Sequence, residues 1–153
     1  MSNTFVIIIH YNTILLKNKS INMKQYVVLK LIGLVILTMA ILIGLSFLEV
    51  AIYSYLINPG QDQSVYEAHA NVSAPYISGI FGFIIFFLVV KYWKKNEYPN
   101  VARLSLMLPV TYLIVDIIIL TAAGVKWSDF IVIFVLANIA KFLGSYLGYT
   151  LTK

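Results

Sequence analysis

The sequence predicts an all-α integral membrane protein, a bundle of four transmembrane helices with up-down-up-down topology. Three observations predict this fold. Apolar residues make up 61% of the 153 residues and charged residues only 11%, against about 45–50% and about 25% in soluble domains. Four apolar stretches are each long enough to cross a bilayer, which takes roughly 20 helical residues. The connections between them are short, and short connections make consecutive helices antiparallel neighbours.

Turn and capping residues delimit the four spans. Asn58-Pro59-Gly60 terminates the first span, and Gly124 follows the third. Ser73 is placed to cap the start of the second span, with Pro75 in its first turn. The predicted spans cover residues 31–57, 75–91, 101–123 and 130–151.

The first 22 residues do not fit the bundle. The apolar run over residues 5–16 is too short to cross a membrane, and polar side chains interrupt it. A second methionine, Met23, stands just before the first span. We interpret residues 1–22 as a doubtful extension upstream of a true start at Met23, and residues 23–153 as a single membrane domain. The alternative is that residues 1–22 form a short segment lying at the membrane interface.

Lysine and arginine are concentrated in the flanks on one side of the predicted bundle. The loop over residues 58–74 contains neither, and the other connection on that side contains only Lys126. The opposite flanks carry nine basic residues, namely Lys17, Lys19, Lys24, Lys30, Lys91, Lys94, Lys95, Arg103 and Lys153. Because basic flanks stay in the cytoplasm, both termini are expected on the cytoplasmic side.

The same distribution bears on partners and location. A net charge of +5 would suggest nucleic acid as the partner of a soluble protein. Here the basic residues flank apolar spans, so we expect the lipid bilayer as the partner and no nucleic acid. Ten lysines to one arginine favour an AT-rich bacterial genome, hence the inner (plasma) membrane. A homo-oligomer and a larger membrane complex both remain open.

Three ionisable side chains fall inside the predicted spans. Glu49 and Asp116 each lie eight residues before the outer end of their span, at a depth of roughly 12 Å. Lys141 lies roughly 16 Å deep, and its flexible stem can move the ammonium by several ångströms. A charge at the bilayer centre costs at least about 2.5–3.5 kcal/mol. We therefore expect the three to meet in one polar layer inside the bundle.

Each of these charges has polar neighbours at helical spacing on its own face. Pro109 should kink the third span and free the carbonyl of Ser105. The candidate polar cluster comprises Glu49, Tyr53, Tyr112, Asp116, Asn138, Lys141 and Ser145.

Small residues predict close packing along the fourth span. Ala140, Gly144 and Gly148 recur every four residues on one face, next to Lys141. We expect this face to pack within the monomer, and dimerisation through it is the alternative.

Three functions compete for the polar cluster. The first is a transport-class or ion- or proton-coupled protein that uses Glu49, Asp116, Asn138 and Lys141 as its interior site. The second is a structural or accessory membrane subunit, in which Asp116 and Lys141 only lock helix packing. The third and weakest is an enzyme that uses Asp62, Glu67 and His69 at the membrane face.

Catalytic and cofactor motifs give no support to an enzyme. The chain has no cysteine, so disulfides and thiolate metal sites are excluded. Neither a phosphate-binding glycine loop nor a metalloprotease or hydrolase motif occurs. We therefore predict no catalytic residues, no metal ligands and no cofactor.

Overall fold

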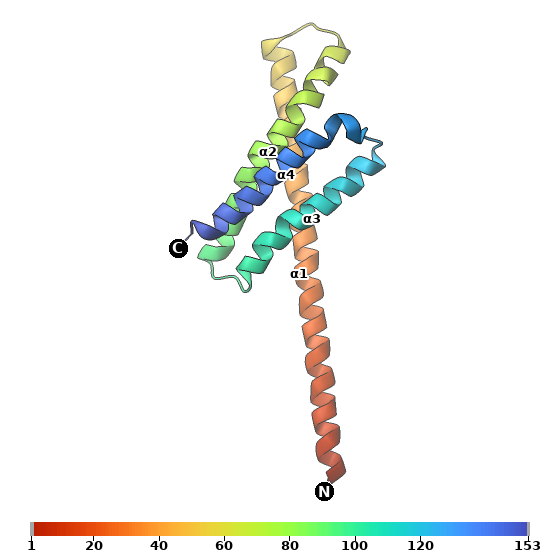
Figure 1. Ribbon diagram of the computed structural model, residues 1–153, viewed down its shortest axis with the longest axis vertical. Coiled ribbons are helices and arrows are strands. Elements are labelled where there is room, and N and C mark those ends of the chain that lie inside the picture. The colour runs from red at the N-terminus through yellow and green to blue at the C-terminus, as the bar shows by residue number, and fades with distance from the viewer. Residues whose placement is uncertain (1, 153) are drawn as a thin grey trace. The chain divides into compact units, whose positions relative to one another are not determined.

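The computed structural model describes the backbone of residues 2–152 and the side chains of residues 27–128 and 130–152. Every regular element in these residues is helical. The elements are α1 (Ser2–Ile52), the π-helix η1 (Tyr53–Ile57), α2 (Gln63–Lys95), α3 (Val101–Ala122) and α4 (Trp127–Thr150). Figure 1 shows them in chain order.

Four helical segments are long and apolar enough to cross a membrane, which confirms that part of the predicted fold. They are Val27–Ile57, Gln63–Lys95, Val101–Ala122 and Phe130–Thr150. Large apolar side chains such as Phe47 and Val132, each 72% exposed, project from these helices. A water-soluble monomer rarely exposes such extensive apolar surface, whereas a lipid-facing helix requires it.

The chain divides into two compact units. The first, Met1–Leu34, holds the N-terminal part of α1. Its helix extends upstream of the predicted first span and passes through position 23 without interruption. The second unit, Val35–Lys153, holds the rest of α1 and the other helices, and all the clusters described below lie within it.

In the second unit, α2 packs most extensively against α4, and α3 also packs against α4 (Figure 1). Two glycines of α4 permit this close approach. A Cβ atom at Gly144 would overlap the carbonyl oxygen of Phe83, and one at Gly148 would lie 2.5 Å from the carbonyl oxygen of Phe87. The small-residue face of α4 therefore packs against α2 of the same chain.

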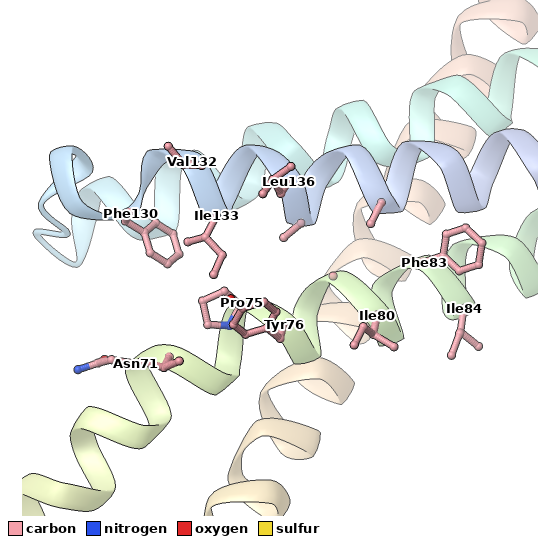
Figure 2. A pocket seen from close by; sticks show the side chains of 14 residues that line it. Asn71, Pro75, Tyr76, Ile80, Phe83, Ile84, Phe130, Val132, Ile133 and Leu136 are labelled. Carbon is pink, nitrogen blue, oxygen red and sulfur yellow. The ribbon is translucent and has the colours of Figure 1, made fainter.

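Helix α2 begins at Gln63, well before the predicted start near residue 75. Ser73 is consequently an interior helix residue and not an N-cap, and Pro75 lies inside the helix. The sequence over residues 63–74 contains neither glycine nor proline, so nothing in it interrupts a helix. Figure 2 shows α2 bending at Pro75, where the ring removes one backbone hydrogen bond.

The C-terminal end of the first membrane segment departs from regular α-helix. The amide of Asn58 donates to the carbonyl of Tyr53 at 2.8 Å, which is the wider hydrogen bond of a π-helix. The predicted terminator Asn58-Pro59-Gly60 then ends the element, with Gly60 at a φ of +78°.

Candidate functional site

Lys141 is the centre of the first polar cluster, which we call the lysine cluster: Ser78, Tyr112, Asp116, Asn138 and Lys141. The Lys141 side chain is 1% exposed. Its ammonium Nζ donates to the hydroxyl of Ser78 on α2 at 2.9 Å. It also lies 4.5 Å from the ring centroid of Tyr112 on α3. One hydrogen bond and one cation–π contact therefore stabilise this charge away from water.

Tyr112 is itself held in place by two contacts. Its hydroxyl lies near that of Ser78. Its ring meets Phe86 edge-on, with a centroid distance of 5.5 Å, and Phe86 is fully buried. Helices α2 and α3 thus each supply one contact to the ammonium of Lys141, which α4 carries.

Asp116 lies one turn beyond Tyr112 on α3, and its carboxylate lies near the Asn138 side chain. Asn138 donates to the carbonyl of Phe134 at 2.9 Å, which fixes its amide. Asp116 and Lys141 are close enough to interact electrostatically. Yet within the part of the chain that the structure describes, the one ion pair within 4.0 Å joins His69 to Glu49. The charged atoms of Asp116 and Lys141 are therefore more than 4.0 Å apart.

The stem of Lys141 occupies space that only glycine leaves open. A Cβ atom at Gly82 of α2 would lie 2.8 Å from Cε and 2.9 Å from Cγ of Lys141. Ser78 and Gly82 are four residues apart, so both face Lys141 from the same side of α2. One contacts the head of the lysine and the other its stem.

Ser145, one turn beyond Lys141, is 1% exposed and joins α4 to α3. Its hydroxyl donates to the carbonyl of Ser105. This is the carbonyl that Pro109 deprives of its helical partner, since proline has no amide hydrogen. Ser145 thus satisfies a backbone group that would otherwise be costly to leave unpaired in the membrane.

Glu49 and Tyr53 do not join the lysine cluster. They belong to a second group, which we call the glutamate cluster: Glu49, Tyr53, His69 and Ser73. The two carboxylate oxygens of Glu49 lie 2.6 Å from Nε2 of His69 and 2.7 Å from the hydroxyl of Ser73. Glu49, Asp116 and Lys141 were predicted to meet in one polar layer, but the structure places Glu49 in a separate cluster. The reason is that α2 starts early and brings His69 and Ser73 beside Glu49.

Aromatic contacts hold His69 in this position. Its ring stacks on that of Tyr53, with centroids 3.6 Å apart and planes within 4°. The hydroxyl of Tyr53 accepts from the Asn58 side chain at 3.2 Å, and its ring meets Tyr66 edge-on. Residues of the π-helical turn and of the start of α2 thus surround the His69 ring that meets Glu49.

Three residues of these clusters were not predicted as site residues: His69 for the polar layer, Ser73 and Ser78. His69 and Ser73 are four residues apart and share one helical face. This spacing would have indicated a shared site if the second helix had been predicted to include residues 69–73. Ser78 stands four residues before Gly82. That spacing indicates helix packing but not a hydrogen-bond partner for lysine.

The structure does not bring together Asp62, Glu67 and His69, the three residues of the enzyme hypothesis. Glu67 forms its hydrogen bond with Gln63 on the surface of α2, whereas His69 is engaged by Glu49. Asp62 stands at the N-cap position of α2 without a side-chain capping bond. Among the described residues, no three metal-ligating side chains come together.

Comparisons with protein-family models, with curated proteins and with solved structures found no match to this chain.

Proposed function

We propose that the chain is an ion- or proton-coupled membrane protein of the transport class, with the lysine cluster as its working site. The observation that supports this most is the separation of Asp116 from Lys141 inside a membrane-spanning bundle. A buried pair that only locks two helices offsets its desolvation through direct, well-formed contact. Here the Lys141 ammonium donates to the neutral Ser78 hydroxyl instead, an arrangement that tolerates a change of charge on Asp116.

Each residue of the lysine cluster then has a role. Asp116, which is partly exposed, takes up and releases a proton or a small cation. Lys141 balances the charge of that carboxylate, and Asn138 fixes its orientation. Ser78 and Tyr112 hold the ammonium in place whether Asp116 is charged or neutral.

A second candidate function is that of an accessory subunit whose polar groups only specify helix packing. Two observations favour it. The Lys141 stem fits against Gly82, and no buried side-chain nitrogen or oxygen lacks a hydrogen-bond partner in the described residues. Full satisfaction of buried polar groups is also what a purely structural network requires.

Substitution of the two charges separates these functions. We expect Asp116→Asn and Lys141→Met each to fold in the membrane yet to abolish ion-coupled activity, because each keeps the shape of the side chain and removes its charge. Monodisperse elution in detergent checks folding, and cell growth together with ion uptake checks activity. Full activity in both single variants would contradict the transport role.

We also propose up-down-up-down topology with both termini in the cytoplasm, in the inner membrane of a bacterium. The distribution of nine basic residues against one supports this orientation. The short connections at residues 58–62, 96–100 and 123–126 favour antiparallel neighbours. An alkaline phosphatase fused after Gly60 should be active, because it would lie outside the cytoplasm, and a fusion after Asn96 should be inactive. The opposite pattern would reverse the orientation.

A further inference from the structure

An apolar groove of about 880 Å³ runs between α2 and α4. It opens where α2 bends at Pro75, so that the first part of α2 diverges from the start of α4 (Figure 2). Gly79 and Ala137, both buried, line the groove where the two helices are in contact, since a Cβ atom at Gly79 would lie 3.4 Å from Cα of Ala137. Phe130 and Ile133 form part of the α4 wall. A volume in this range is typical of sites for small organic molecules, roughly 300–1,000 Å³.

The polar groups of the groove are confined to one end. Asn71 lies at that end, beside Pro75 and Tyr76, whereas Phe83 and Ile84 lie at the other (Figure 2). Pro75 has no amide hydrogen, so the carbonyl of Asn71 loses its helical donor and can accept a hydrogen bond from elsewhere. Among the side chains that the structure describes, none that lines the groove is acidic, basic or a histidine. An occupant therefore meets hydrogen-bonding groups at its head, apolar side chains along its length, and no charge.

We propose that this groove binds an uncharged single-chain amphiphile, a long-chain alcohol that enters from the membrane. Its hydroxyl would donate to the amide oxygen of the Asn71 side chain, and its tail would lie along the α2–α4 seam toward Phe83. The groove lies within membrane-spanning helices, so the occupant must be soluble in hydrocarbon. A charged headgroup is disfavoured, because no residue of the lining could compensate it.

This inference does not depend on ion coupling. The groove residues Gly79, Ala137 and Ala140 stand next in sequence to Ser78, Asn138 and Lys141 of the lysine cluster, but none of them belongs to it. Asp116→Asn should therefore leave alcohol binding unchanged, whatever it does to ion uptake. Failure of one proposal would leave the other standing.

Native mass spectrometry of the detergent-purified full chain, titrated with hexadecanol and with hexadecane, tests the proposal. Wild type should bind one hexadecanol, and more tightly than hexadecane. Ala140→Phe should weaken hexadecanol binding at least about tenfold by filling the groove. The matched control is Leu143→Phe, which places the same phenylalanine side chain on an exposed face of the same helix and should bind as wild type does.

The head of the ligand is tested separately. Asn71→Leu should weaken hexadecanol binding about threefold to tenfold, the effect of one lost hydrogen bond, and leave hexadecane unaffected. Asn71 is exposed, so this variant keeps the test decisive if Ala140→Phe does not fold. Equal binding of alcohol and alkane would overturn the proposal, as would equal effects of Ala140→Phe and Leu143→Phe.

Discussion

Gly144→Ala is expected to separate α2 from α4 and to destabilise the bundle. The added Cβ overlaps the carbonyl oxygen of Phe83, which is backbone and cannot rotate away. Overpacking of a close contact typically costs about 1–3 kcal/mol. Because Ser78 and Gly82 reach Lys141 through this same interface, the lysine cluster should be disturbed as well. The thermal unfolding midpoint in detergent measures the effect.

The chain supplies a matched control in Gly44→Ala. A Cβ atom at Gly44 meets nothing within 4 Å, and alanine favours the helix by up to about 1 kcal/mol over glycine. Gly44→Ala should therefore leave the midpoint unchanged or raise it, whereas Gly144→Ala lowers it. Similar midpoints for the two variants would mean that α2 and α4 do not approach as described.

Glu49→Leu is expected to release the start of α2 from the end of α1. It removes the carboxylate that accepts from Ser73 and pairs with His69, and it leaves both partners without their acceptor. Hydrogen bonds to a charged group contribute about 1.5–3 kcal/mol each. Glu49 and His69 are 34% and 26% exposed, so solvent screening reduces the loss to about 1–2 kcal/mol in total.

Amide hydrogen exchange across residues 63–74 measures this release. A loss of about 1–2 kcal/mol corresponds to exchange roughly fivefold to thirtyfold faster in that segment. Glu67→Leu is the control, because Glu67 is exposed and contacts only Gln63 of its own helix among the hydrogen bonds described. If both variants exchange alike, the glutamate cluster does not hold the two helices together.

The helical class and the membrane-spanning segments could be predicted from the sequence because a run of some 20 apolar residues has few other stable states. The third and fourth helices differ from their predicted bounds by only a few residues. The second helix was mispredicted at its start, since Pro75 indicated a helix beginning and not a bend within a longer helix. Proline is tolerated inside membrane helices when neighbours satisfy the freed carbonyl, and that depends on tertiary contacts.

The polar layer could be predicted only in part for the same reason. Helical spacing placed Tyr112 and Asp116 on one face, and Asn138 and Lys141 on another, and the structure brings these four together. Glu49 was grouped with them only because its estimated depth in the membrane is similar. Depth along a helix does not determine the direction in which a side chain points. Its partners His69 and Ser73 became visible only once residues 63–74 were seen to be helical.

Proton or cation uptake by proteoliposomes that contain wild type, the two single variants or the double variant Asp116→Asn/Lys141→Met is the most direct test of the proposed function. If the lysine cluster carries ion coupling, wild type takes up the ion under an imposed gradient, and all three variants lose uptake although they remain folded. Restoration of full function by the double variant would contradict this account, because it would show that the two charges only compensate each other structurally.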